Sequence, residues 1–257
     1  MKKCCADLRI RSVDRPTPHH VVLHLVSPMP VHDIRPGQFV EVRVDGTSST
    51  MLRRPISINN VVPEQNEIWL LVHNVGNGTD WMARRQPGNT LNCVLPLGNG
   101  FTLPTAGERP LLVGGGVGTA PLLYLGRRCA ELGATPVFLL GAKSECDLMQ
   151  LDEFEKVGRV CITTEDGSRG ERGFVTNHSV LQSETFSRIQ VCGPKPMMKA
   201  VAKYAAYVGV ECEVSLENMM ACGLGACLCC VEKTVKGNLC VCKDGPVFNI
   251  NDLLWQI

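Results

Sequence analysis

The sequence predicts a multi-domain β and α/β protein in three parts. We expect an antiparallel β-barrel in residues 1–104, a doubly wound parallel-sheet nucleotide domain in 105–217 and a small cysteine-rich module in 218–257. Short apolar runs come first, alternating strand and helix patterns follow, and six of the fourteen cysteines gather near the end. A chain of 257 residues is long enough for two cores and a small third module.

The first part shows short runs rich in Val, Ile, Leu and Thr, separated by Pro, Gly, Asn and Asp. Strands are expected at residues 20–25, 38–44, 56–58, 68–73 and 90–95. A single helix is expected at residues 80–86, closed by Pro87 and Gly88. Several short strands with almost no helical periodicity favour a β-barrel or a sandwich.

The second part alternates apolar strands with helices. The strands are expected at residues 111–113, 137–140, 160–164, 188–191 and 210–216, and the helices at 121–131, 147–157 and 196–208. Pro at the first turn of the first helix and Gly after its end support its limits. Such alternation predicts a parallel sheet with helices on both faces.

Composition excludes some kinds of partner. The net charge of +1 leaves no excess of Lys and Arg for nucleic-acid phosphates. The N-terminal residues lack the apolar core of a signal peptide, and the longest apolar run, residues 110–124, is broken by Gly and Pro. We therefore expect a cytoplasmic protein that binds neither nucleic acid nor membrane.

The cysteines near the end indicate a metal centre. Cys222, Cys227 and Cys230 form a C-x4-C-x2-C pattern, which delivers three thiolates to a [2Fe–2S] cluster. The fourth thiolate is expected from Cys242 or Cys240. A zinc site is the alternative, but Cys240 and Cys242 are one residue apart and only half satisfy its paired C-x2-C spacing. A disulfide framework is disfavoured, because the remaining cysteines are scattered along a long chain.

Two glycine turns in the second part are candidates for a dinucleotide site. Gly116, Gly118 and Thr119 lie where the first strand passes into a helix, so the backbone can approach a pyrophosphate. A second turn, Gly193-Pro194, is expected at the same edge of the sheet. A tight turn with no ligand is the alternative.

The first part offers an anion site. Arg53 and Arg54 stand beside a strand, and guanidinium groups bind phosphate oxygens in a bidentate manner. Gly78 and Thr79, at the start of the expected helix, form a second phosphate cradle. A solvated positive edge is the alternative.

Together these motifs resemble the ferredoxin–NADP reductase superfamily, and more closely the electron-transfer subunits of class 1B dihydroorotate dehydrogenases. The resemblance covers essentially the whole chain and implies FAD on the barrel, NAD(H) on the parallel sheet and [2Fe–2S] in the last module. The motifs that carry it are Arg54-Pro55-Ile56-Ser57, Gly76-x-Gly78-Thr79, Gly116-x-Gly118-Thr119, Cys192-Gly193-Pro194 and the terminal cysteines.

The resemblance also implies roles for single residues. FAD would contact Arg54, Pro55, Ile56, Ser57, Leu71, Val72, His73, Gly78 and Thr79. NAD(H) would contact Gly116, Gly118, Thr119, Gly193 and Pro194, with Cys192 close to the hydride path as the candidate catalytic residue. The cluster ligands would be Cys222, Cys227, Cys230 and Cys242, with Cys229 and Cys240 as bystanders. Two positions depart from the pattern: Ile56 replaces a flavin-stacking aromatic residue, and Val72-His73 replaces Tyr-Arg.

The function implied is an electron relay in pyrimidine biosynthesis. A catalytic partner with FMN would oxidise dihydroorotate, and electrons would reach NAD+ through the cluster and FAD, in a heterotetramer with two copies of each subunit. One alternative is an NAD(P)H reductase subunit for ferredoxin, hydrogenase or a sulfide-linked enzyme, in which Asp often replaces the first cluster cysteine. Another is a redox-sensing or zinc-stabilised binding module.

Overall fold

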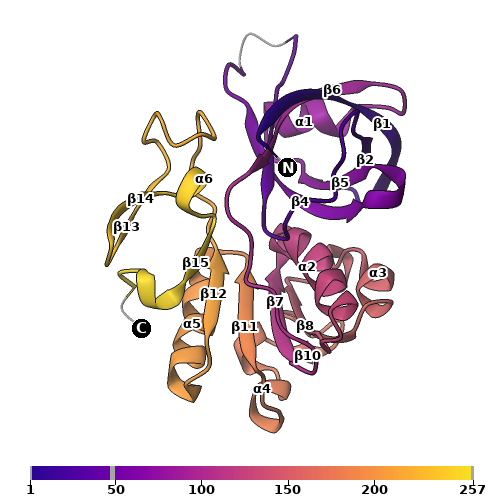
Figure 1. Ribbon diagram of the computed structural model, residues 1–257. Helices are drawn as coiled ribbons and strands as arrows, with labels where there is room; N and C mark the ends of the chain where they lie inside the picture. The colour runs from indigo at the N-terminus through magenta and orange to yellow at the C-terminus, as the bar shows by residue number, and fades with distance from the viewer. Residues whose placement is uncertain (1, 47–49, 256–257) are drawn as a thin grey trace. The chain divides into compact units, whose positions relative to one another are not determined.

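The computed structural model describes residues 2–46 and 50–255 and divides into two compact units (Figure 1). The first unit contains the described residues up to Gly100, together with 217–232 and 238–246. The second contains residues 101–216, 233–237 and the described residues from Val247 onward. The segment predicted as a separate cysteine-rich module is therefore shared between the two units.

The first unit is built on a closed antiparallel barrel, which confirms the predicted fold class for this part. Its strands are β1 (Cys4–Thr17), β2 (His20–Val26), β3 (Phe39–Val42), β4 (Arg54–Val62), β5 (Glu67–His73) and β6 (Thr90–Leu97). They pair in the order β1-β2-β5-β4-β3-β6, and β6 returns to β1 to close the ring. The barrel interior is filled by Leu8, Ile10, Leu23, Leu25, Ile58, Ile68, Leu70, Leu91 and Leu95, all fully buried.

Strand β1 was missed by the sequence analysis, although its pattern is regular. Ala6, Leu8 and Ile10 are buried, whereas Asp7 and Arg9 between them are exposed. This is the period of two expected for a strand with one face on the core. The alternating charged residues leave no continuous apolar run, which is the pattern that predicted the other strands.

One helix, α1 (Asn77–Ala83), belongs to the barrel and begins three residues earlier than predicted. Gly76 precedes it with extended backbone angles. The Thr79 hydroxyl, at the third position, accepts the N–H groups of Val75 and Gly76 at 3.0 and 3.1 Å. This capping fixes the start of the helix at the glycine turn rather than at Asp80.

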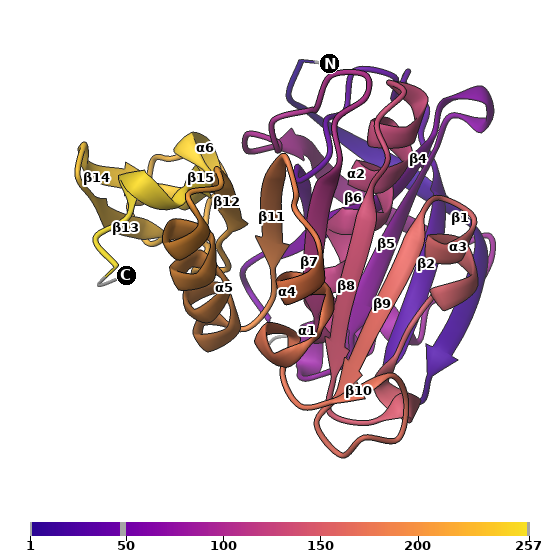
Figure 2. The same ribbon diagram turned by 90° about the horizontal axis from the view of Figure 1, so that it is seen from below.

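The second unit contains a seven-stranded sheet in the order β10-β9-β8-β7-β11-β12-β15 (Figure 2). Its parallel strands are β7 (Pro110–Gly115), β8 (Val137–Ala142), β9 (Arg159–Thr164), β10 (Glu171–Arg172), β11 (Arg188–Cys192) and β12 (Cys212–Ser215). The helices are α2 (Ala120–Glu131), α3 (Leu151–Glu155), α4 (Val180–Ser183) and α5 (Lys195–Val208). Helix α3 is shorter than the predicted helix 147–157, because residues 145–147 form a separate 3-10 turn.

The strand order reverses between β7 and β11, which are neighbours in the sheet. The chain moves outward from β7 to β8 and β9, and then returns to β11 and continues to β12 on the other side. Right-handed crossovers in opposite directions place helices on opposite faces, as in a doubly wound fold. The carboxyl ends of β7 and β11 therefore define the switch point where ligands bind in such sheets.

The predicted last strand of this sheet is not its edge. The short strand β15 (Val247–Asn249) pairs antiparallel with β12, with Phe248 opposite Val214. The predicted parallel sheet is confirmed, and it gains one antiparallel edge strand that the sequence analysis did not expect, because a strand that returns from the cysteine-rich segment leaves no local signal.

The remaining elements are short. Strands β13 (Val231–Thr234) and β14 (Gly237–Cys240) form a two-stranded sheet, and α6 (Val241–Asp244) follows directly. Turns of 3-10 helix occur at Pro63–Gln65, Gly116–Thr119, Glu145–Asp147, Val175–Asn177 and Ile250–Asp252. Within residues 2–46 and 50–255, the helices are all too short or too polar to cross a bilayer.

Candidate functional site

Three of the predicted cluster thiols accept hydrogen bonds from backbone N–H groups. Leu224 N–H donates to Cys222 Sγ at 3.4 Å, and Gly225 N–H donates to Cys242 Sγ at 3.1 Å. Cys242 N–H in turn donates to Cys230 Sγ at 3.4 Å. Such donors stabilise thiolates rather than thiols, and they are the contacts that iron–sulfur ligands receive.

The four predicted ligands lie as two pairs. Backbone N–H donation, first of all from Leu224, lowers the pKa of Cys222 to about 6, and the Cys227 side chain contributes a further hydrogen bond. Cys242 contacts Cys230, while burial is the main reason that the pKa of Cys242 is raised to about 12. Among the described residues, no three His, Cys, Asp or Glu side chains are placed to hold a single metal ion. Two pairs of thiolates match the two irons of a [2Fe–2S] cluster, each of which takes two protein ligands.

The thiol loop, residues 222–230, packs on the barrel within the same unit. Gly223 has φ +67°, and a Cβ there would lie 2.8 Å from Glu41 Cγ and 3.0 Å from Leu97 Cδ1. In the segment that follows Cys240 and Cys242, the backbone oxygens of Lys243 and Asp244 accept hydrogen bonds from Asn99 Nδ2 at 3.2 and 3.0 Å. The glycine is therefore needed for close approach, and both cysteine-bearing segments are fixed to the barrel.

Glu41 was not identified from the sequence as a site residue. It lies on β3 with 1% of its surface exposed, and neither carboxylate oxygen has a hydrogen-bond partner among the described residues. Burial raises its pKa to about 7, Arg53 lowers it and Cys222 raises it further. A charged residue within the apolar strand Phe39–Val42 was the available signal.

The two adjacent arginines have different roles. Arg53 Nη1 donates to the backbone oxygens of Glu41 and Asn92 at 3.2 and 2.9 Å, so it ties β3 and β6 together. Arg54 instead lies over the first turn of α1, where a Cβ on Gly78 would come within 2.7 Å of Arg54 Nε. Of the two arginines, Arg54 lies at the predicted phosphate cradle, whereas Arg53 is held by the backbone of β3 and β6.

Residues of β4 and β5 complete the candidate flavin site. Pro55, Ile56 and Ser57 are half-buried on β4. On β5, Leu71 and Val72 are 2% and 0% exposed, so their side chains are buried. His73 is half-buried and stacks on His20, with ring centroids 4.3 Å apart.

The two glycine turns of the second unit meet at the switch point. Gly116 has φ +56°, and a Cβ on Gly118 would lie 2.5 Å from Gly193 Cα and 2.6 Å from the Cys192 carbonyl oxygen. Gly115 likewise packs against Pro194. The predicted residues from both turns are thus brought together at the carboxyl ends of β7 and β11.

Thr119 closes the first of these turns as Thr79 closes the turn in the barrel. The Thr119 hydroxyl donates to the Gly116 oxygen at 3.1 Å, and the Thr79 hydroxyl donates to the Gly76 oxygen at 3.0 Å. Each hydroxyl is therefore engaged within its own turn. A phosphate at either turn would be bound by backbone N–H groups instead. Cys192, the candidate catalytic residue, is 1% exposed at the end of β11.

This architecture defines a class: oxidoreductases with a barrel of the ferredoxin-reductase type, a nucleotide-binding sheet and an iron–sulfur segment. Solved structures support the class. One described as an NADH-dependent reduced ferredoxin-NADP oxidoreductase, studied for flavin-based electron bifurcation, matches with TM-score 0.87 and 30% identity, covering 96% of this chain and 90% of that one. A ferredoxin reductase of carbazole 1,9a-dioxygenase shares the fold, with TM-score 0.71 at 21% identity over 82% and 67% of the two chains.

Sequence comparison narrows the class. The family model for the iron-sulfur cluster binding domain of dihydroorotate dehydrogenase B matches residues 217–254, and that for the oxidoreductase NAD-binding domain matches residues 112–203. Two relatives carry the name dihydroorotate dehydrogenase B (NAD(+)), electron transfer subunit. The relative from Shouchella clausii is 42% identical over 87% of this chain and 88% of its own length, and that from Fusobacterium nucleatum is 40% identical over 85% and 86%. The chain belongs to the family of dihydroorotate dehydrogenase B electron transfer subunits.

Proposed function

We infer that this protein is the electron-transfer subunit of an NAD-dependent dihydroorotate dehydrogenase, with FAD, a [2Fe–2S] cluster and NAD(H) as its redox groups. The observation that carries this inference is the packing of the thiol loop on the barrel, with Gly223 against Glu41 and Leu97. A cluster held there would share one compact unit with a flavin bound to the same barrel. Family membership supports the assignment.

The groups differ in the electrons they exchange: a nicotinamide takes a hydride, an iron–sulfur cluster takes one electron, and a flavin handles both. The role of the protein is to hold them in order. Cys222, Cys227, Cys230 and Cys242 are the proposed cluster ligands. Backbone N–H groups donate to three of them, Cys222, Cys230 and Cys242, and would stabilise the thiolates.

For FAD, we propose that Arg54 and the backbone N–H groups of Gly78 and Thr79 bind the pyrophosphate. Pro55, Ile56 and Ser57 on β4 would lie along the flavin. The side chains of Leu71 and Val72 are buried, so these residues would contribute backbone groups, whereas the half-buried His73 is the β5 side chain available to the cofactor. Ile56 offers an aliphatic surface in place of an aromatic ring.

For NAD(H), we propose that Gly116, Gly118 and Thr119 bind the pyrophosphate through their backbone. The second turn, Gly193 and Pro194, would bound the nicotinamide pocket, with Cys192 at its base. The support is the contact between the two turns at the switch point of the sheet.

The family name implies a catalytic partner. We propose that this partner carries FMN and oxidises dihydroorotate to orotate in pyrimidine biosynthesis, and that two copies of each subunit form a heterotetramer. We place the complex in the cytoplasm, because thiols clustered around a metal centre suit a reducing compartment.

Reconstitution tests the proposal. The purified protein is expected to show flavin and iron–sulfur absorption, and when mixed with the FMN-containing partner it should support NAD+-dependent orotate formation. A coloured, folded protein that reduces NAD+ with another donor, but never with the partner and dihydroorotate, would refute the assignment.

One observation favours a second candidate. The structure matched at TM-score 0.87 is named for the oxidation of reduced ferredoxin. A ferredoxin-linked NAD(P)H reductase is therefore the rival, and reduction of ferredoxin by NADH or NADPH in the absence of the partner would support it. Cys222, at the position where such subunits often have Asp, favours the first assignment.

A further inference from the structure

A fifth thiol, that of Cys240, lies close to the loop that carries three of the proposed ligands. Cys240 is 8% exposed and its Sγ lies 3.8 Å from the Gly225 carbonyl oxygen. The N–H of the same residue, Gly225, donates to Cys242 Sγ at 3.1 Å. Cys240 and Cys242 therefore approach the same residue of the thiol loop, and both are buried there.

The two cysteines outside the ligand pattern differ in burial. Cys240, at the end of β14, is buried and its Sγ faces the Gly225 carbonyl oxygen. Cys229 differs: its side chain is exposed on the loop surface, next to Leu228 at φ +60°. Of the two cysteines outside the ligand pattern, Cys240 alone is buried.

The local backbone also suits an exchange between the two thiols. Cys240 ends β14 and Cys242 stands in the first turn of α6, two residues later. Cys240 N–H donates to Asp244 Oδ2 at 2.7 Å, and Asn99 holds the Lys243 and Asp244 carbonyls. With the backbone held at both ends, exchange requires changes in the two side chains rather than refolding of the segment.

We propose that Cys240 is a reserve ligand that replaces Cys242 on the cluster iron when the bond to Cys242 is broken. In this exchange the bond from iron to Cys242 Sγ breaks and a bond from iron to Cys240 Sγ forms. Cys240 loses its thiol proton, the released Cys242 thiolate takes up one, and no electron is gained or lost. The inference rests on the proposed cluster and adds a ligand that the family pattern does not contain.

Alanine variants of the full chain test this, because alanine, unlike serine, offers no oxygen ligand. We expect Cys242→Ala to keep a [2Fe–2S] cluster with an altered EPR spectrum in the reduced state, measured with iron and acid-labile sulfide per chain. Cys240→Ala/Cys242→Ala should lose the cluster, whereas the matched control Cys229→Ala/Cys242→Ala should keep it. A folded Cys242→Ala protein without cluster, or loss of cluster in the Cys229 control alone, would overturn the proposal.

A second measurement needs no change at Cys242, in case that variant does not fold. The native protein and Cys240→Ala are treated with iodoacetamide, and alkylated Cys242 is quantified by mass spectrometry alongside cluster absorbance. In the native protein, chains alkylated at Cys242 should retain their cluster; in Cys240→Ala, alkylation and bleaching should rise together. Equal bleaching in both proteins contradicts the exchange.

These results are separable from the proposed function. A native protein that contains no cluster would contradict the relay itself, whereas a native protein with a cluster and a colourless, folded Cys242→Ala variant contradicts only the reserve ligand.

Discussion

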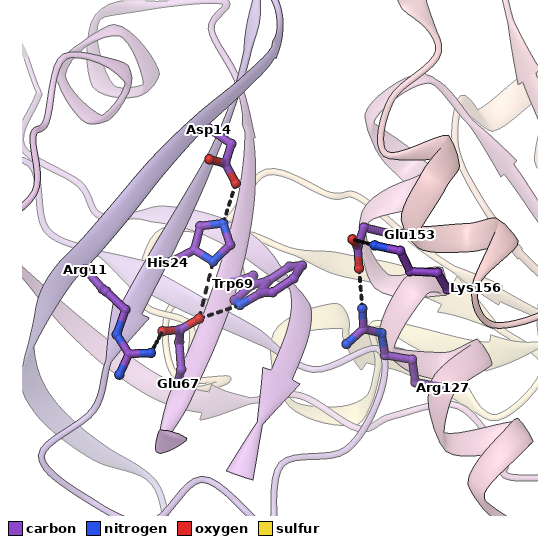
Figure 3. Close-up of polar contacts among 8 residues, drawn as sticks. All are labelled: Arg11, Asp14, His24, Glu67, Trp69, Arg127, Glu153 and Lys156. Atoms are coloured by element: carbon purple, nitrogen blue, oxygen red, sulfur yellow. Dashed lines mark hydrogen bonds and ion pairs between the residues drawn. The ribbon is translucent and has the colours of Figure 1, made fainter. Parts of the chain in front are cut away.

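His24 Nε2 lies 2.8 Å from Asp14 Oδ2, and the other nitrogen of the same ring lies 3.3 Å from Glu67 Oε1 (Figure 3). Glu67 is 3% exposed and also pairs with Arg11 at 3.1 Å. The His24 ring packs against Trp69, its direct partner on β5, with ring centroids 4.4 Å apart. The imidazole thus joins three strands of the barrel that carries the candidate flavin site.

Replacing this ring should destabilise the barrel. His24→Ala removes the packing against Trp69 and leaves Glu67 with fewer partners, so we expect a loss of about 1–3 kcal/mol in the free energy of unfolding. Thermal or denaturant unfolding measures this. His32→Ala is the control, because His32 is 64% exposed in its pair with Asp33, and its change should stay within about 0.5 kcal/mol. Equal effects of the two variants would contradict a structural role for His24.

Glu41 should make stability depend on pH. Its folded pKa of about 7 is raised above the unfolded value of 4.5, so the folded state binds more protons between these pH values. The contribution of Glu41 to the free energy of unfolding is therefore fully present below pH 4.5. It is lost as the pH rises toward 7, by on the order of 1–3 kcal/mol. Glu41→Gln should remove this part of the dependence.

The measurement for Glu41 is the difference in Tm between native protein and Glu41→Gln at several pH values. The difference should grow in favour of the variant from acid to neutral pH and then level off. A difference that does not vary with pH would show that the carboxyl group does not titrate in this range.

Gly78→Ala should weaken FAD binding. The added Cβ would lie 2.7 Å from Arg54 Nε and 3.0 Å from Arg54 Cγ, so the guanidinium must move from the cradle. We expect FAD affinity to fall by about tenfold, which corresponds to about 1.4 kcal/mol. Gly76→Ala is the matched control, because a Cβ there meets nothing within 4 Å and the backbone is extended. FAD titration of apoprotein compares the two, and similar affinities would remove Arg54 from the site.

Gly118→Ala should weaken NAD(H) binding without affecting the flavin or the cluster. Its Cβ would meet backbone atoms of Gly193 and Cys192 at 2.5 and 2.6 Å, which cannot move aside as a flexible side chain can. The two turns must separate, so the KM for NADH should rise by about ten- to hundredfold. NADH oxidation with ferricyanide as acceptor provides the assay. Flavin and iron contents should be unchanged; an unaltered KM would place the nucleotide elsewhere.

Much of this architecture followed from local sequence patterns. The apolar runs and turns predicted the barrel, the alternation of strands and helices predicted the parallel sheet, and the positions of Gly116 and Gly193 placed both turns at one edge. The spacing of Cys222, Cys227 and Cys230 by itself indicated an iron–sulfur centre. These are short-range signals, each contained within a few residues.

The features that were missed depend on contacts between distant residues. No local pattern distinguishes Arg53 from Arg54, because the difference arises from the pairing of Arg53 with Asn92 on β6. Glu41 is recognised as a neighbour of the thiol loop only because Gly223, which is distant in sequence, packs against it. Strand β15 is positioned by pairing with β12, which lies more than thirty residues earlier in the chain.

Strand β15 also affects how the chain can fold during synthesis. Until residues 247–249 leave the ribosome, β12 is an open edge of the nucleotide-binding sheet, with unpaired N–H and C=O groups available to another chain. The segment that carries the thiols must be made before this edge is covered. A truncation that removes only the last dozen residues would therefore leave β12 as an unpaired, aggregation-prone edge strand, although every proposed cluster ligand would still be present.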